Sequence, residues 1–188
     1  MRWLPFQLNP DLPATGIARK DYIERKWGAN RGSEVYARVA SAGKQVGIDF
    51  AFESIAVQPN TLEAHRLLHY AEQNDVQDEM AEVLFQAYFI DGANLTDRDT
   101  LVDLALRAGL DADAAEAYLA SDTDRDVIAQ ADVEARTAGI GGVPFFIFNR
   151  KVGVSGTQEA DALLQAMERA RRSEEEGPPS GDPTAKAG

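Results

Sequence analysis

The stretch that decides the fold is Gly139-Ile140-Gly141-Gly142-Val143-Pro144-Phe145-Phe146-Ile147-Phe148, which places a proline at the start of an apolar strand. Because Pro144 has no backbone N–H, it cannot donate to a strand ladder, and the chain just before it stays free to meet another segment. Gly141 and Gly142 leave room for close approach from outside. We therefore expect a strand that begins at a binding loop, with a substrate peptide as one candidate occupant.

A second short apolar run, Lys151-Val152-Gly153-Val154, follows the first after only Asn149-Arg150. Asparagine tolerates the positive φ that a tight hairpin turn requires, so the two runs are expected to pair as an antiparallel hairpin. Gly156 ends the second strand, and Thr157 is a candidate N-cap for a following helix. The C-terminal part is therefore predicted as a hairpin and then a helix.

The N-terminal part mixes extended and helical patterns. Residues 2–8 carry several large apolar side chains and end in a proline-rich loop, which predicts a short strand. Helices are expected at 21–27 and 33–45, and a brief extended piece at 48–52.

The middle of the chain, from Thr61 to Ala138, follows a helical pattern almost throughout. Thr61, Asp75 and Asp97 stand at three expected helix starts, and Asp111 at a fourth. A polar side chain at such a position can accept a hydrogen bond from an unpaired N–H group of the first turn. We expect four or five helices in this block.

Composition excludes several classes of function. The 188 residues contain 31 acidic and 19 basic side chains, so the formal charge of −12 argues against binding nucleic acid or an anionic membrane surface. No run of about 18 apolar residues is present, and the first residues do not form a signal peptide, which predicts a cytoplasmic protein. With no cysteine in the sequence, disulfides, thiolate zinc sites and a thiol nucleophile are excluded for these residues.

Taken together, the motifs and their order resemble the DsbA-like thioredoxin superfamily over residues 2–172, and within it the FrnE-type dithiol-disulfide oxidoreductases. The segments that carry the resemblance are Trp3-Leu4-Pro5-Phe6-Gln7-Leu8-Asn9-Pro10, Asn60-Thr61-Leu62-Glu63-Ala64-His65-Arg66-Leu67, Gly142-Val143-Pro144-Phe145-Phe146 and Val154-Ser155-Gly156-Thr157-Gln158.

The resemblance implies an α/β, thioredoxin-like fold with a helical insertion. Residues 1–58 and 139–172 would form the thioredoxin-like domain, and residues 59–138 the insertion. Residues 173–188 are rich in Glu, Pro, Gly and Ser and lack large apolar side chains, so their composition predicts a disordered tail.

The resemblance also implies a site. In the family a cis peptide bond precedes the proline that matches Pro144, and this loop lies beside the active disulfide. The implied substrate-binding residues are Gly142, Val143, Pro144 and Phe145. The backbone of Val143 would pair with an extended substrate segment as an added strand does. The implied partner is a protein or a small molecule that carries a thiol or a disulfide.

The sequence departs from the family in one respect, because the family has a strand, a Cys-x-x-Cys motif and a helix before the strand that matches residues 2–8. Thiol-disulfide exchange needs a thiolate of lowered pKa and a resolving thiol. We therefore assign no catalytic residue and expect the chain as given to be inactive. Our hypothesis is that this βα unit of roughly 30 residues is missing from a shortened version of the protein. The unpaired strand edges left behind favour self-association, which makes a homodimer one expected state.

Two other functions stay open. One is the related group of 2-hydroxychromene-2-carboxylate isomerases and kappa-class glutathione transferases, in which glutathione is the cofactor and a serine of the absent segment carries the chemistry. The other is a non-catalytic module that binds peptides or partners. With a thiol-disulfide oxidoreductase, no cofactor is expected.

His65 and His69 are spaced as two metal ligands on one helix would be. The zinc-protease pattern needs a glutamate directly after the first histidine, and Arg66 occupies that position. We therefore interpret both as core or interface histidines and predict no metal site.

Overall fold

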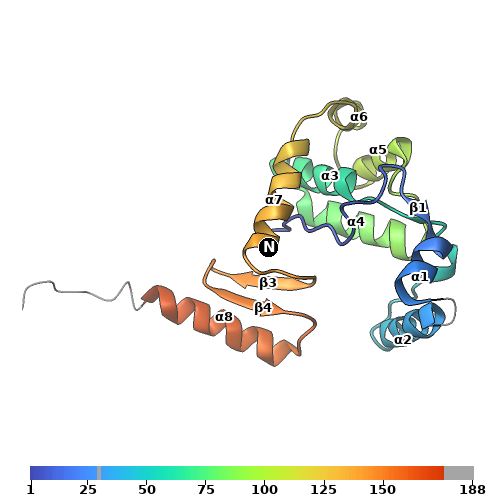
Figure 1. Ribbon diagram of the computed structural model, residues 1–188. Coiled ribbons are helices and arrows are strands. Elements are labelled where there is room, and N and C mark those ends of the chain that lie inside the picture. The colour runs from blue at the N-terminus through green and yellow to red at the C-terminus, as the bar shows by residue number, and fades with distance from the viewer. Residues whose placement is uncertain (29–30, 176–188) are drawn as a thin grey trace, which may run out of the picture. The chain divides into compact units, whose positions relative to one another are not determined.

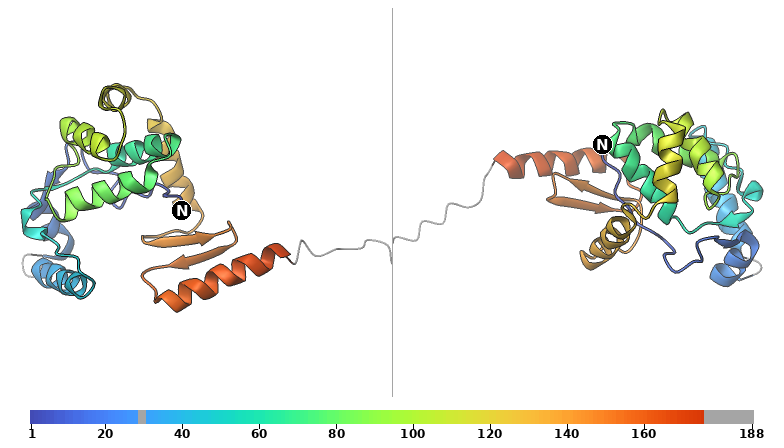
Figure 2. Two further views of the ribbon diagram at one scale, coloured as in Figure 1. Left: turned by 180° about the vertical axis from the view of Figure 1, so that it is seen from behind. Right: turned by 90° about the horizontal axis from the view of Figure 1, so that it is seen from above.

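The computed structural model describes residues 1–28 and 31–175 (Figure 1). The chain divides into two compact units, Met1–Glu134 and Ala135–Gly188. The first is helical apart from one pair of very short strands. The second holds a β-hairpin and the last helix, and the two views of Figure 2 show that helix lying along the hairpin.

The helical unit contains two strands, a single turn of 3-10 helix and most of the helices. They are β1 (Ile17–Ala18), α1 (Arg19–Trp27), α2 (Arg31–Gln45), the 3-10 turn Phe52–Ser54, β2 (Val57–Gln58), α3 (Leu62–Gln73), α4 (Gln77–Phe89), α5 (Arg98–Arg107), α6 (Ala112–Ala120) and α7 (Arg125–Thr137), whose last turn belongs to the second unit. β1 and β2 are antiparallel and pair Ile17 with Gln58.

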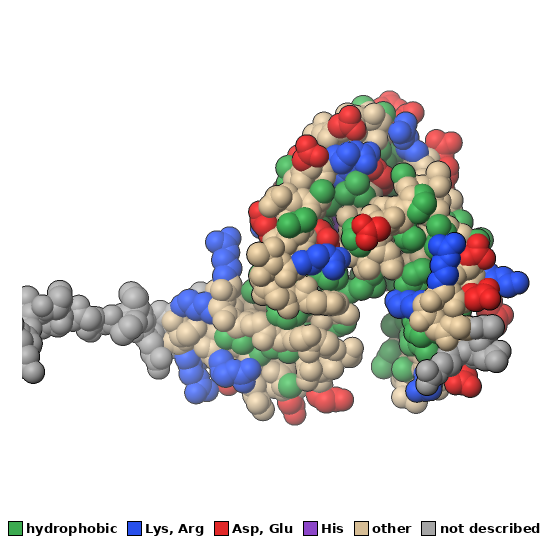
Figure 3. Space-filling view, in the orientation of Figure 1, with side chains coloured by type: hydrophobic (Ala, Val, Ile, Leu, Met, Phe, Trp, Pro, Cys, Tyr) green, Lys and Arg blue, Asp and Glu red, His purple; other side chains and the backbone are tan. Residues whose placement is uncertain are grey.

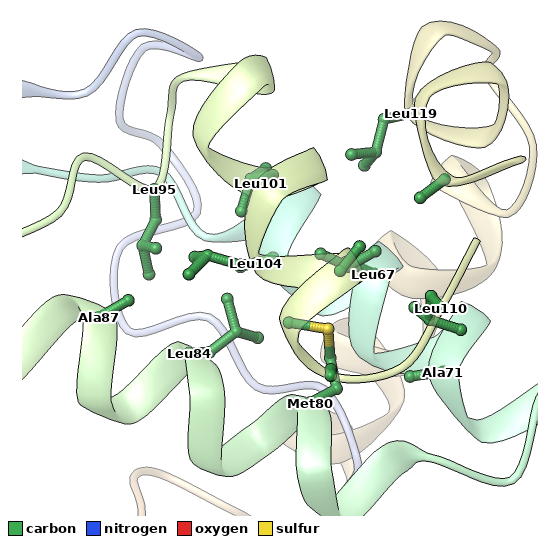
Figure 4. Packing of buried hydrophobic residues seen from close by; sticks show 14 of the residues in the cluster. Leu67, Ala71, Met80, Leu84, Ala87, Leu95, Leu101, Leu104, Leu110 and Leu119 are labelled. Atoms are coloured by element: carbon green, nitrogen blue, oxygen red, sulfur yellow. The ribbon is translucent and has the colours of Figure 1, made fainter. Parts of the chain in front are cut away.

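The core of this unit lies between α3, α4, α5 and α6. Leu67, Met80 and Leu101 are at most 1% exposed. Figure 4 shows Leu84 of α4 and Leu104 of α5 pointing toward each other across this core. Apolar residues three or four positions apart share one face of a helix, so each helix turns one stripe inward. The predicted helical block is therefore held by its own hydrophobic core.

Two of the predicted helix starts are confirmed in detail. The Asp97 carboxylate accepts a hydrogen bond from the Thr100 N–H at 3.0 Å and begins α5. The Asp111 carboxylate accepts one from the Ala114 N–H at 2.8 Å and begins α6. In both cases a carboxylate pairs with an N–H group that the helix itself leaves free.

At the other two predicted helix starts a helix forms, but the predicted residue does not cap it. Thr61 precedes α3, but its side chain makes no capping bond, and the Asn60 side chain accepts the Leu62 N–H at 3.0 Å instead. Asp75 has a φ of 59° and lies in the turn before α4, which begins at Gln77. Asn60 displaces Thr61 because its amide also donates to backbone carbonyls of the N-terminal loop, a tertiary contact that local pattern does not show.

The predicted strand at residues 2–8 is not formed. The Gln77 side chain accepts from the Trp3 N–H and donates to the Trp3 carbonyl, each at 3.0 Å. The Asp132 carboxylate accepts from the Gln7 N–H at 2.7 Å. Helix side chains thus satisfy backbone groups that a neighbouring strand would otherwise satisfy.

The other expectations for the N-terminal part have mixed outcomes. α1 and α2 confirm the helices predicted at 21–27 and 33–45, each beginning two residues earlier. The extended piece at 48–52 forms no strand, and its last residue begins the 3-10 turn. Strands β1 and β2 were not predicted, because two residues are too few to show an alternating pattern.

The second unit contains the predicted hairpin. β3 (Phe145–Phe148) and β4 (Val152–Ser155) are antiparallel, with Phe145 opposite Ser155 and Phe148 opposite Val152. Asn149 and Arg150 both have positive φ, 51° and 56°, and the Lys151 N–H donates to the Phe148 carbonyl across the turn. The prediction of a tight turn at Asn149-Arg150 is confirmed.

Helix α8 (Ala160–Glu175) packs against both strands and buries Ala166 and Ala170. In Figure 3 basic side chains gather toward its C-terminal end and acidic ones near its start, an order that suits the helix dipole. The helix begins three residues after Thr157. Residues 173–175 of the predicted tail are helical, because the last turn continues the amphipathic helix, and residues 176–188 lie outside the described part.

The aromatic residues of β3 and of the N-terminal segment are only partly buried. Phe145, Phe146 and Phe148 of β3 are half-buried, as are Trp3 and Phe6 in the other unit. Helix α8 covers one face of the two-stranded sheet. A single helix cannot enclose large rings on both faces of a hairpin. The assignment of residues 1–58 and 139–172 to one domain, with an insertion at 59–138, stays a prediction.

The core position Leu104 and the surface position Leu106 provide a matched pair of substitutions in α5. Leu104 is 3% exposed and Leu106 is 59% exposed. Leu104→Ala is expected to lower the free energy of unfolding by about 2–5 kcal/mol, because it leaves a cavity. Leu106→Ala is expected to change it by less than about 0.5 kcal/mol. Urea unfolding measures both, and equal effects would contradict the placement of the core.

Candidate functional site: the Val143-Pro144 loop

The Val143-Pro144 loop follows the C-terminal end of α7, which is closed by two backbone hydrogen bonds. The Gly139 N–H donates to the Arg136 carbonyl and the Ile140 N–H to the Ala135 carbonyl, both at 3.0 Å, and Gly139 has a φ of 86°. This pair of bonds is the Schellman arrangement, in which a glycine with left-handed backbone angles closes the helix. The chain is thereby released from α7 directly before Gly141 and Gly142.

The loop ends at a fixed proline. The peptide bond between Val143 and Pro144 is cis. The Pro144 carbonyl accepts a hydrogen bond from the Gly156 N–H at 2.9 Å, which extends the pairing of β3 and β4 by one step. Pro144 has no N–H, so its one backbone hydrogen-bonding group is used on the β4 side.

The residue before the proline is open. Val143 is 50% exposed. Within residues 1–28 and 31–175, neither the N–H nor the carbonyl of Val143 has a hydrogen-bond partner. Apart from the glycine itself and its two chain neighbours, no atom lies within 4 Å of the point where a Cβ would stand on Gly141 or Gly142. The loop therefore presents a donor and an acceptor with unobstructed space beside them.

Strand β3 continues this open surface. In the described part of the chain it pairs with β4 alone, so its other edge carries unpaired backbone groups. Ile147 is 47% exposed. A Cβ on Gly153 would stand 2.9 Å from the tip of the Phe145 ring, so glycine there lets the ring lie across β4. Sequence reasoning did not identify Gly153, although a glycine within an apolar strand indicates a close approach.

The four predicted site residues, Gly142 to Phe145, thus form one continuous surface in the structure. Their geometry gives a strand-like segment an edge to pair with, at the point where the proline interrupts the ladder. The role of these residues in substrate binding stays a prediction.

The two histidines lie in the helical unit. His69 approaches two carboxylates, with its Nδ1 3.7 Å from Glu72 and its Nε2 3.7 Å from Asp124. Together with Trp3, His65 and His69 line a cavity of about 100 Å³. Among the described residues no group of three or more His, Cys, Asp or Glu side chains is placed to hold a metal ion.

Burial lowers the pKa of His65, an effect opposed by the Phe6 carbonyl and the Asp132 carboxylate. An unfolded chain takes up this proton near pH about 6.5, so unfolding is favoured as the pH falls through that value. We expect the free energy of unfolding to decrease between about pH 7.5 and about pH 5.5, and His65→Gln to reduce that decrease. Urea titrations of the wild type and the variant at both pH values measure the free energy of unfolding. An identical pH dependence in the variant would refute the role of His65.

The family with the description "DSBA-like thioredoxin domain" matches residues 1–168. The chain belongs to this family. It is also similar to a solved structure, that of a probable DsbA oxidoreductase from Streptomyces coelicolor, with 26% sequence identity and a TM-score of 0.80, covering 97% of this chain and 76% of that one. The predicted DsbA-like α/β fold is therefore confirmed.

The chain is also similar to YwbO, an uncharacterised protein of Bacillus subtilis. The two are 27% identical in an alignment over 172 residues that covers 89% of this chain and 80% of YwbO. None of the described helices of this DsbA-like chain is both long and apolar enough to cross a membrane.

Proposed function

We propose that the Val143-Pro144 loop binds an extended segment of a thiol- or disulfide-bearing substrate, as the substrate-binding half of a FrnE-type oxidoreductase site. The observation that carries this proposal is that Val143 is exposed and its backbone groups are unpaired within the described residues, next to a proline whose carbonyl accepts from the Gly156 N–H. The membership of the chain in the DsbA-like family supports it.

The binding would follow the rules of strand addition. A peptide lying along the loop can donate to the Val143 carbonyl and accept from the Val143 N–H. Each such bond contributes about 0.5–1.5 kcal/mol after exchange with water. Backbone bonds of this kind do not depend on side-chain identity, so a loop of this type accepts many sequences. Gly141 and Gly142 leave the space that the incoming chain would occupy.

The redox chemistry itself needs groups that these residues do not contain. Disulfide exchange begins when a thiolate attacks a sulfur atom, and a second thiol then resolves the mixed disulfide. The 188 residues contain no cysteine. The proposed role of the described residues is therefore to hold the substrate, and the thiol pair would have to be supplied by a segment or a protein outside them.

Peptide binding tests the loop directly. The probe is a fluorescein-labelled, extended peptide with one S-methylated cysteine, followed by fluorescence anisotropy. Gly142→Val is expected to weaken binding at least about tenfold, which corresponds to about 1.4 kcal/mol. Since no atom beyond the two chain neighbours lies within 4 Å of the added Cβ, the melting temperature of this variant should match that of the wild type. Met167→Ala, at an exposed position of α8, is the control and should bind normally.

Two further probes test the backbone hydrogen bond and the glutathione-dependent alternative. A peptide that is N-methylated at the cysteine position cannot donate its backbone N–H and should bind more weakly than the parent. Oxidised glutathione that competes better than the peptide would favour the glutathione-dependent group. Equal binding by wild type and Gly142→Val would contradict a role for the loop.

We also predict that the chain as given neither reduces insulin nor oxidises a dithiol, because it supplies no thiolate. Insulin turbidity and dithiothreitol oxidation measure this, and turnover by purified protein of this sequence would disprove it. The upstream Cys-x-x-Cys segment expected from the family stays a prediction. Translating the reading frame before Met1 would test it.

A further inference from the structure

A second candidate site lies in the helical unit, where an arginine is buried without a counter-charge. Arg19 is the first residue of α1 and is 8% exposed. None of the ion pairs among the described residues includes Arg19. Burying a charge is costly unless an opposite charge or a set of hydrogen bonds compensates for it, so the absence of a carboxylate partner there is unusual.

The side chains that the Arg19 guanidinium contacts directly are neutral. Its Nη1 donates to the side-chain oxygen of Gln58 and to the Tyr88 hydroxyl. Its guanidinium carbon lies 4.8 Å from the centre of the Tyr36 ring. Burial raises the pKa of Tyr36, and it raises the pKa of Tyr88 to about 12, so neither phenol supplies a negative charge near neutral pH.

Part of the guanidinium is left without partners. The Nε atom is buried and makes no hydrogen bond. Within the residues that the structure describes, Nη2 also makes none. A guanidinium offers its N–H groups in a planar fork that matches the two oxygens of a carboxylate. The unused edge of Arg19 is thus suited to a planar anion.

Arg19 lines a cavity of about 410 Å³, a volume typical of sites for small molecules. Ile55 is buried beside it, and Ile23 and Phe52 form half-buried apolar walls. The remaining lining residues are exposed at the rim: Lys20, Glu24, Glu53 and Ala56. The cavity therefore combines one buried cation, apolar walls and a rim that carries both positive and negative side chains.

We propose that this cavity binds a small organic monocarboxylate whose carboxylate pairs with Arg19 and whose apolar body lies against Ile23, Phe52 and Ile55. The ligand would supply the carboxylate partner that Arg19 lacks among the described residues. Glu24 and Glu53 outnumber Lys20 at the rim and repel a second negative charge, so monoanions are favoured over dianions such as hydrogen phosphate. The start of α1 adds a partial positive charge on the same side.

Calorimetric titration with benzoate tests the proposal, because benzoate is a planar monocarboxylate with an apolar ring. Benzamide has the same shape without the charge, and inorganic phosphate has charge without an apolar body. Benzoate is expected to bind saturably with one site per chain. Benzamide and phosphate should each bind at least about tenfold more weakly.

Four variants locate the binding. Arg19→Met keeps most of the side-chain length without the charge and should weaken benzoate binding at least about tenfold. Ala56→Leu, which leaves Arg19 in place and narrows the rim, should also weaken it. Glu53→Gln removes a repulsive charge and should strengthen it. Arg25→Met, in the same helix but outside the cavity lining, is the control and should bind as the wild type does.

The following results would overturn the proposed carboxylate site. If benzoate does not bind, or if benzamide binds equally well, the proposal is overturned. It is also overturned if phosphate binds better than benzoate, or if a folded Arg19→Met variant retains full affinity. Should Arg19→Met fail to fold, an undiminished affinity of Ala56→Leu would overturn it equally, and weaker binding in that variant would support it.

Discussion

Pro144 has one backbone hydrogen-bonding group where other residues have two, and the candidate site depends on that constraint. The Pro144 carbonyl is held by the Gly156 N–H, which ties the start of β3 to the end of β4. On the other side no N–H is present, so the ladder stops, and among the described residues neither backbone group of Val143 has a hydrogen-bond partner. The same proline therefore fixes one side of the loop and keeps the other side open.

The two units are stabilised in different ways. The helical unit has a hydrophobic core of its own, in which Leu67 and Met80 are completely buried. The hairpin unit has no large, fully buried side chain among its described residues, and small residues of α8 pack against its strands. A loop carried by such a hairpin is positioned mainly by hydrogen bonds, of which the Schellman bonds at Gly139 and the Pro144 to Gly156 bond are the nearest.

Local patterns predicted the parts of the fold that local chemistry determines. The hairpin follows from Asn149 and the apolar runs beside it, and the starts of α5 and α6 follow from Asp97 and Asp111. Residues 2–8 were predicted wrongly, because their backbone bonds end on Gln77 and Asp132, far along the sequence. The cavity at Arg19 could not be predicted, since β1 and β2 bring it beside Ile55 through a pairing of only two residues each.

The central claim, that the Val143 backbone receives an extended chain, can be measured at that residue. In a two-dimensional NMR spectrum of the labelled protein, addition of the S-methylated cysteine peptide should shift the Val143 amide resonance and slow its hydrogen exchange. The Gly156 amide, already bonded to Pro144, should keep its slow exchange throughout. Saturable peptide binding that leaves the Val143 amide unshifted and its exchange unchanged would contradict the account.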